Sequence, residues 1–205
     1  MRVLFFDTET TGLPKDKYTC ATFSRDNWPD VVSISWQLFY YDEMIRKETF
    51  LIKPEGWIIS EEVTKIHGIS HEKAQEEGVA LEKALALFKT DLESCDMVVA
   101  HNIEFDRNVL LNAYKWRLGM NTAFWPFKNE FCTAQKSKAD LKLPSRQKVV
   151  NPKDPYKLPR LDELYEATFG EPAPKLAHTS ERDVDVLQNI FWARWSISEI
   201  KGSKI

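Results

Sequence analysis

The stretch VLFFDTETTGLP, residues 3–14, joins a run of apolar residues to two acids and a turn. The apolar run predicts a buried, central strand over residues 2–6. Asp7 and Glu9 follow where this strand ends, and because side chains of extended chain alternate, both point to the same side. Two adjacent carboxylates without a partner repel each other. The pair therefore indicates either a bound divalent cation or a polar cap of the turn at residues 10–12.

Further along the chain, apolar residues recur with the periods of strands and of helices. We expect strands at 31–41, 45–53 and 97–102, helices at 60–68, 80–94, 103–118, 161–169 and 180–199, and irregular chain over 120–160. This order predicts one α/β domain over residues 1–205, with helices flanking a mixed sheet. In such sheets ligands bind at the carboxyl ends of the parallel strands, where Asp7 and the pair His101-Asn102 lie.

Length, charge and cysteine content limit the possible functions. The chain has 205 residues and a formal net charge of −3, which argues against a protein that coats nucleic acid through bulk positive charge. Its three cysteines are widely spaced, so we expect neither a disulfide framework nor a cysteine zinc site. The N-terminus does not resemble a signal peptide, and no apolar run approaches a membrane span. We therefore expect a cytoplasmic, reducing location and no membrane partner.

Two later stretches place acids on the apolar faces of predicted helices. Asp106 lies three residues before Val109, and Asp183 lies four before Leu187. A buried acid needs a counter-charge or a metal ion, although Asp106 is also consistent with a partly exposed acid stabilised by a helix dipole. His178 stands just before the second helix, where it is either a general base or a surface loop histidine. Asp185 points elsewhere and is expected to be solvated.

Taken together, these stretches resemble the three motifs of the DEDDh exonucleases, the DnaQ-like superfamily that includes proofreading subunits of bacterial DNA polymerases. The first motif is DTETTGL at residues 7–13, the second is HNIEFD at 101–106, and the third is His178 followed after four residues by Asp183. The resemblance covers roughly residues 2–195 and is closest to the proofreading, epsilon-type branch. It implies a ribonuclease-H-like fold with a five-stranded mixed sheet flanked by helices.

The resemblance also implies a reaction: 3′→5′ hydrolysis of phosphodiester bonds, preferentially at single-stranded or mismatched DNA ends, with release of nucleoside 5′-monophosphates. Two Mg²⁺ or Mn²⁺ ions would lie about 4 Å apart. Asp7 would bridge both ions, Glu9 and Asp183 would complete the first site, and Asp106 would hold the second. His178 would deprotonate the attacking water. The candidates for substrate binding are Thr8, Thr10, Leu13, His67, Asn102 and Phe105.

Several of these residues have a second interpretation. His67 precedes Gly68 and also fits the end of a short helix, and Phe105 fits a core aromatic as well as a residue that stacks on a base. The segment between Pro14 and Pro29 is longer than the compact turn typical of the family, and it is either a flap beside the substrate or an insertion. Basic residues in 120–160 either flank the substrate backbone or solubilise a loop: Lys136, Lys138, Lys142, Arg146, Lys148, Lys153, Lys157 and Arg160. FWPF, 124–127, predicts a loop anchored in the core.

Two other functions remain open at this stage. A 3′→5′ exoribonuclease would share the motifs, because contacts to the 2′-hydroxyl depend on details of the pocket; the sequence DTETTGL favours the proofreading branch. A catalytically silent nucleic-acid-binding module is disfavoured, since all four acids and the histidine are present. The chain ends soon after its last predicted helix, without the long tail by which proofreading subunits bind a polymerase. We therefore expect a stand-alone enzyme, or one encoded by a phage or mobile element, and leave polymerase association and oligomeric state open.

Overall fold

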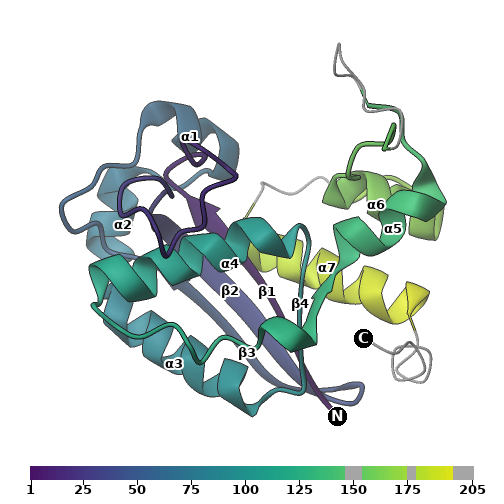
Figure 1. The fold of residues 1–205 in the computed structure, drawn as a ribbon, viewed down its shortest axis with the longest axis horizontal. Coiled ribbons are helices and arrows are strands. Elements are labelled where there is room, and N and C mark those ends of the chain that lie inside the picture. The colour runs from purple at the N-terminus through teal and green to yellow at the C-terminus, as the bar shows by residue number, and fades with distance from the viewer. Residues whose placement is uncertain (146–153, 175–178, 196–205) are drawn as a thin grey trace.

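The structure, a computed structural model, describes residues 1–145, 154–174 and 179–195. Its centre is one mixed sheet (Figure 1). The five strands of this sheet have the order β3-β2-β1-β4-β5. The strands are β1 (Arg2–Thr10), β2 (Val31–Tyr40), β3 (Glu43–Leu51), β4 (Met97–Ala100) and β5 (Glu130–Cys132). β1 pairs antiparallel with β2 and parallel with β4, and β2 and β3 form an antiparallel hairpin. The predicted fold class, a five-stranded mixed sheet flanked by helices, is confirmed.

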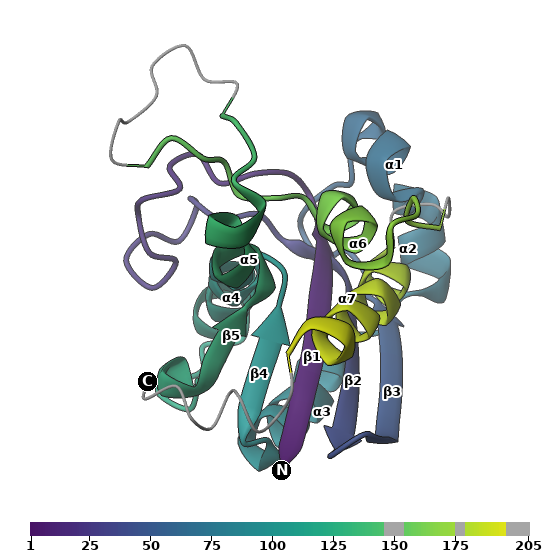
Figure 2. The ribbon, with the colours of Figure 1, turned by 90° about the vertical axis from the view of Figure 1, so that its right-hand side faces the viewer.

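Helices cover both faces of this sheet. They are α1 (Glu61–His67), α2 (His71–Glu77), α3 (Leu81–Ser94), α4 (Ile103–Asn112), α5 (Thr133–Leu141), α6 (Leu161–Phe169) and α7 (Ser180–Arg194). A π-helical turn, Ala113–Arg117, continues α4, and a 3-10 turn, Phe127–Asn129, precedes β5. α3 and α4 lie on one face of the sheet, and α7 crosses the other with α6 packed against it (Figure 2). Among the described residues, no helix combines the length and apolar composition needed to cross a membrane.

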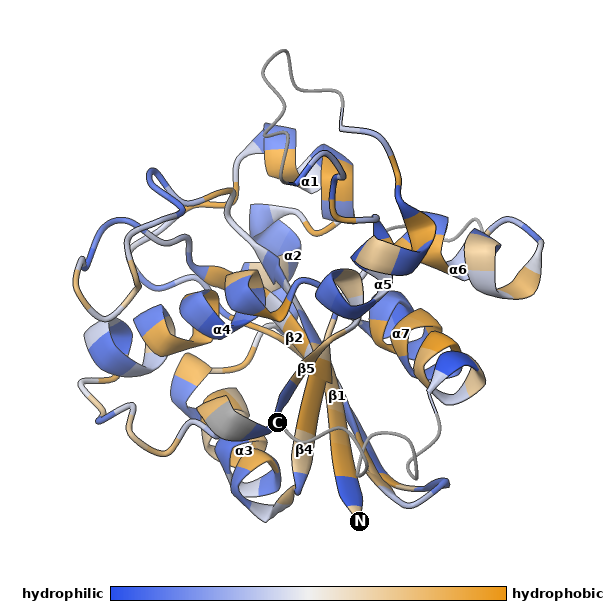
Figure 3. Ribbon diagram, turned by 45° about the vertical axis from the view of Figure 1, so that its right-hand side comes forward, coloured by the Kyte–Doolittle hydropathy of each residue, from blue (hydrophilic) through white to orange (hydrophobic). Residues whose placement is uncertain are grey.

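β1 is buried on both faces, which explains its unbroken apolar run. Leu4 and Phe6 pack toward α3 and α4, whereas Val3 and Phe5 pack toward α7. Much of β1 and of β4 is accordingly coloured as hydrophobic in Figure 3. A strand with two buried faces reads as a continuous apolar run instead of an alternating one.

β1 also continues further than the sequence predicts. It runs through Asp7 and Glu9 to Thr10, instead of ending near residue 6. Asp7 lies opposite Ser35 and Glu9 lies opposite Ser33 in the β1–β2 ladder, and the register shifts directly after Glu9. Both acids therefore sit in regular strand and point to the α7 face, as the two-residue repeat predicts.

The prediction of irregular chain over 120–160 is wrong in part, because this range contains β5 and α5. β5 has only three residues, too few for an alternating pattern to be visible. α5 has the sequence TAQKSKADL, which offers few apolar residues at helical spacing. The helix α2 was not predicted for the same reason, since it is short and mostly polar. In each case tertiary contacts supply the stability that the local pattern does not reveal.

The FWPF loop is anchored in the core as predicted. Trp125 is 3% exposed and donates its indole N–H to Glu130 at 2.6 Å. The last predicted helix begins at Ser180 as expected, and residues 196–199 of its predicted range lie outside the described residues.

Candidate active site

A cavity of about 520 Å³ opens at the carboxyl end of β1, beside the first turns of α4 and α7. All four predicted acids line it: Asp7, Glu9, Asp106 and Asp183. They come from three elements that are distant in the sequence, and the sheet brings them together because β1 and β4 are parallel neighbours. This is the edge at which parallel strands present ligand sites.

Three of the acids form a compact group. Asp7, Glu9 and Asp183 each offer a carboxylate oxygen, and these oxygens all lie within 4.8 Å of one another. Asp106 lies deeper in the same cavity and is 3% exposed. Carboxylate oxygens at this spacing are the ligands that hard divalent cations such as Mg²⁺ prefer, so the residues present fit the cations that the sequence motifs imply.

Thr8, which lies between the two acids of β1, holds Asp106 in place. Its backbone N–H and its hydroxyl both donate to Asp106 Oδ1, at 3.1 and 2.6 Å. Thr8 also lines the cavity. Thr8 is a predicted substrate contact. In addition, it links β1 to α4 through its hydrogen bonds to Asp106.

The acids shift one another's protonation. Burial, and then the charges of neighbouring carboxylates, raise the pKa of Glu9 to about 8 and that of Asp7 well above its usual range. The pKa of Asp106 rises to about 7, mainly through burial, although the two hydrogen bonds from Thr8 oppose the rise. A cation between these groups would remove the repulsion and keep them ionised.

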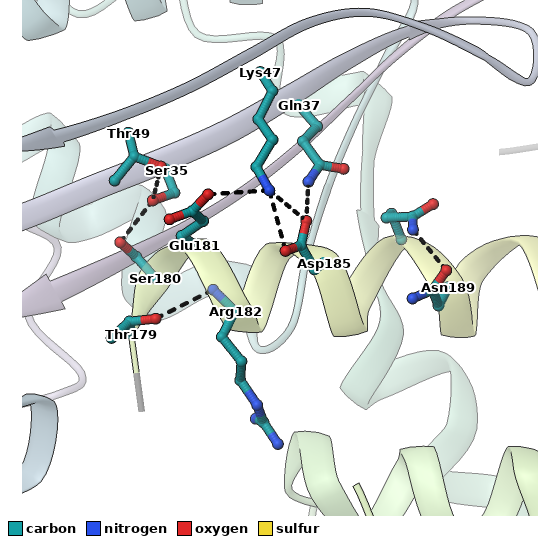
Figure 4. Close-up of polar contacts among 11 residues, drawn as sticks. Ser35, Gln37, Lys47, Thr49, Thr179, Ser180, Glu181, Arg182, Asp185 and Asn189 are labelled. Atoms are coloured by element: carbon teal, nitrogen blue, oxygen red, sulfur yellow. Dashed lines mark hydrogen bonds and ion pairs between the residues drawn. The ribbon is translucent and has the colours of Figure 1, made fainter. Parts of the chain in front are cut away.

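Arg182 supplies a positive charge next to this group, and the sequence analysis missed it. Its guanidinium donates to Asp183 Oδ1 at 2.6 Å, to Asp162 Oδ1 at 2.9 Å and to the Pro174 carbonyl at 2.9 Å. The Arg182 side chain is buried, and in Figure 4 it points away from the sheet. Neighbouring residues on a helix do not normally face each other, so an Arg-Asp pair in sequence carried no signal of this contact.

Buried hydroxyl groups fix the first turn of α7 to the sheet. Ser180 Oγ lies 2.9 Å from Ser33 Oγ and 2.8 Å from Ser35 Oγ, and Ser35 contacts Thr49 in turn (Figure 4). Because Ser33 and Ser35 lie opposite Glu9 and Asp7, these bonds tie the α7 acid to the β1 acids. Thr179 caps the helix by accepting from the Arg182 N–H. The alternation of β2 predicted a strand but not this role for its serines.

Asp185 lies on α7 outside the cavity, and its separation from Asp183 agrees with the prediction. It is not simply solvated, because it accepts from Gln37 and from Lys47, the latter at 2.9 Å (Figure 4). This acid therefore serves the contact between α7 and the sheet.

The predicted substrate-binding residues differ in where they lie. Asn102 and Phe105, at the start of α4, line the cavity; Asn102 adopts the left-handed conformation with φ 62°, which asparagine tolerates well. Thr10 instead donates to the Gly12 carbonyl at 2.7 Å and builds the turn after β1, where Gly12 has φ 148°. Leu13 is 83% exposed beyond that turn.

His67 lies at the end of α1 and is only 2% exposed. Its Nδ1 accepts from the Ile69 N–H at 3.1 Å, and Gly68 ends the helix in the left-handed conformation. These features agree with the interpretation of His67 as part of the end of a short helix. The neighbouring Ile66, which the sequence analysis did not single out, lines the cavity instead. His178, the predicted base, lies outside the described residues.

His101 of the second motif is a buried connector. Its ring nitrogens lie 2.9 Å from Thr133 Oγ1 and 2.9 Å from the Pro159 carbonyl. Burial lowers the pKa of His101 to about 4, so it is neutral near pH 7. It therefore joins the end of β4 to α5 and to the segment before α6. Arg160, which caps α6, and Asp162, in the first turn of that helix, also line the cavity.

The predicted basic stretch is partly used in ion pairs. Lys138 contacts Asp154 at 2.5 Å, and Lys157 contacts Glu163 at 2.6 Å. Arg160 lines the active-site cavity with a largely exposed side chain. Arg146, Lys148 and Lys153 lie outside the described residues.

With this geometry in place, comparison with known proteins identifies the family. A family model described as exonuclease, of the RNase T type, matches residues 4–191. The chain belongs to this exonuclease family. The match confirms the DnaQ-like superfamily that the three motifs indicated.

The individual relatives of this chain are distant. The DNA polymerase III PolC-type of Mycoplasmopsis pulmonis (strain UAB CTIP) is 28% identical over 200 residues, which cover 96% of this chain and 12% of the polymerase. E. coli exonuclease I in complex with a dT13 oligonucleotide superposes with a TM-score of 0.68 at 17% identity, over 98% of this chain and 43% of that one. Exonuclease I from Methylocaldum szegediense gives a TM-score of 0.61 at 17% identity, over 94% and 40%. These structures share the fold, and the chain spans less than half the length of each relative.

The raised acid pKa values predict how the stability of the metal-free protein depends on pH. Glu9 and Asp106 have pKa values of about 8 and about 7 in the folded chain, whereas both acids ionise near pH 4 in an unfolded chain. The folded state therefore binds more protons in this interval, and the free energy of unfolding falls as pH rises. We expect a loss of about 2 kcal/mol between pH 6.5 and 8.5, measured by denaturant unfolding in EDTA.

The chosen interval and controls isolate these acids. His101, with a folded pKa of about 4, is mostly neutral in both states above pH 6.5, so it contributes little slope. Glu9→Gln should flatten most of the decline, and so should saturating Mg²⁺. Constant or rising stability in EDTA over this interval would contradict the electrostatic account.

The second prediction concerns Arg182. Arg182→Met keeps most of the side-chain volume but leaves Asp183 without this guanidinium, so the metal-free protein should lose about 2 kcal/mol of stability. The stabilisation gained on adding Mg²⁺ should be larger in the variant than in the wild type, because the cation then replaces a missing positive charge. Thermal unfolding with EDTA and with Mg²⁺ measures both effects. An unchanged melting temperature in EDTA would show that Arg182 does not hold the acid group.

Proposed function

We propose that this protein is a metal-dependent 3′→5′ exonuclease that removes nucleoside 5′-monophosphates from single-stranded or mismatched 3′ ends of DNA. The observation that carries the proposal is the open cavity in which Asp7, Glu9 and Asp183 converge within 4.8 Å beside Asp106. These are the four acids of the family's motifs, in a chain whose match to the exonuclease family spans residues 4–191.

The choice of DNA is supported by the relatives. Exonuclease I has been solved with a dT13 oligonucleotide, and the PolC-type relative is a DNA polymerase. The first motif, DTETTGL, also favours the proofreading branch. If the protein cleaved only RNA, it would be reassigned as a 3′→5′ exoribonuclease, which catalyses the same class of reaction.

The acids would hold the cations. Asp7, Glu9 and Asp183 would hold one Mg²⁺ or Mn²⁺, and Asp7 with Asp106 would hold a second. Bound there, such ions lower the pKa of a water molecule and neutralise negative charge on the phosphate. The chain's own residues keep this arrangement: Thr8 fixes Asp106, and the Arg182 guanidinium and the serine contacts of α7 fix Asp183.

His178 is proposed as the base that takes the proton of the attacking water. It directly precedes Thr179, the cap of α7, and Asp183 follows in the first turn of that helix. A histidine ionises near neutral pH and so can accept a proton there and release it again. Asn102 and Phe105, at the cavity wall, would orient the terminal nucleotide.

The assay pairs two acids of the same helix. Asp183→Asn should lower the rate of 3′ shortening by about two orders of magnitude or more, because it removes a cation ligand, whereas Asp185→Asn should retain most of the activity because Asp185 contacts Gln37 and Lys47 outside the cavity. The substrates are 5′-labelled single-stranded DNA, mismatched duplex and single-stranded RNA, each with Mg²⁺ or Mn²⁺.

Three results would decide between the alternatives. Ladders that shorten from the 3′ end of DNA support the proposal. Ladders on RNA alone would reassign the enzyme as an exoribonuclease. A lack of metal-dependent cleavage by the wild type on all three substrates would sink both and favour a silent binding module.

The role of His178 is tested separately. His178→Ala should lower kcat by about 10²- to 10⁴-fold, since a positioned base is lost. Its affinity for Mn²⁺, measured by calorimetry, should stay close to that of the wild type. A collapse of metal affinity would mean that His178 acts on the cation site and is not the base.

A further inference from the structure

A second cavity, of about 670 Å³, lies next to the active site and is not explained by the chemistry above. Asn102 and Phe105 line both cavities, so the second one continues the first. Its outer wall is the long segment after β1, including Leu13 and residues 14–18. This is the segment that exceeds the compact turn typical of the family.

Buried polar contacts fix this segment. Asn27 is 7% exposed; its side chain accepts from the Asp16 N–H at 2.8 Å and donates to the carbonyls of Asp16 and Thr19 at 2.7 and 3.2 Å. Trp28 also donates its indole N–H to the Thr19 carbonyl, at 2.7 Å. The loop therefore has its own scaffold of internal hydrogen bonds.

The same segment is tied to α4 and to the π-helical turn after it. The Asn108 side chain accepts from the Ala21 N–H at 3.0 Å, and the Trp116 indole donates to the Ala21 carbonyl at 2.8 Å. α4 also carries Asp106. The loop is thus positioned relative to the acids by the helix that it shares with the active site.

On this fixed loop Tyr18 is 86% exposed and lines the second cavity. Lys17 Nζ lies 5.1 Å from the centre of the Tyr18 ring. Phe105 and Trp28, whose ring centres are 5.9 Å apart, form the inner wall. The cavity therefore presents aromatic faces on two sides.

The charges of the lining are balanced. Lys15 and Lys17 face Asp16 and Glu104. The Asp16 carboxylate is engaged within the loop, since it accepts from the Thr19 hydroxyl at 2.6 Å and from the Tyr18 N–H at 3.0 Å. Because two lysines and two acids line it, the cavity has no excess positive charge that would attract anions in general. Its occupant is selected by aromatic contact more than by charge.

We propose that this second cavity binds the nucleotides that precede the 3′-terminal one in a single-stranded DNA substrate, with a base stacked on Tyr18. Bases stack on exposed aromatic rings whatever their sequence. A base paired within a duplex is not free to do so, which restricts this contact to unpaired DNA. The inference rests on the proposed exonuclease activity, and it gives the long loop a substrate-binding role.

The test compares a long substrate with a minimal one. A single-stranded dT12 oligonucleotide reaches both cavities, whereas p-nitrophenyl thymidine 5′-monophosphate has no preceding nucleotide. In Tyr18→Ala, the ratio of kcat/KM on dT12 to kcat/KM on the minimal substrate should fall about tenfold, the loss of one stacked base. Tyr18→Phe keeps the ring and should keep the ratio.

A matched control is available on the same loop. Phe23 is 83% exposed but does not line the cavity, so Phe23→Ala should leave the ratio unchanged. An unchanged ratio in Tyr18→Ala, or an equal fall in Phe23→Ala, would overturn the inference while leaving the exonuclease activity intact. If the wild type cleaved neither substrate, the proposed function itself would be refuted.

Discussion

Mutual repulsion among four carboxylates is the constraint on which the rest of this structure depends. Asp7, Glu9, Asp106 and Asp183 meet in one partly buried cavity, and burial, followed by the charges of neighbouring carboxylates, raises the pKa values of the first three. Such a group is unfavourable without positive charge nearby. The chain meets this need in part with Arg182 and with the hydrogen bonds from Thr8, and divalent cations would meet the remainder.

The sheet and α7 hold these acids close together. β1 is packed on both faces, so its backbone cannot shift to separate Asp7 from Asp183. Ser180 binds Ser33 and Ser35 on the neighbouring strand, which keeps the start of α7 close to β1. Polar contacts hold the first turns of α7 against the sheet (Figure 4). Further along the same helix, Leu187 and Phe191 belong to the core.

The long loop after β1 is held by contacts of its own and by contacts to α4 and the turn that follows it. Its scaffold of Asn27 and Trp28 is internal, and its ties to Asn108 and Trp116 reach the helix that carries Asp106. A segment built this way can extend the active-site cavity without disturbing the acids.

Spacing within the sequence determined the fold class, the acids on the inner faces of β1, α4 and α7, and the family, because strand and helix periods and motif order are local properties of the chain. It did not determine the three-residue β5, the polar α5 or the burial of His67, whose stability comes from contacts with distant segments. Nor did it reveal Arg182 beside Asp162, or the second cavity behind Phe105. Those features depend on side chains from separate elements meeting in space, and only the tertiary structure decides such meetings.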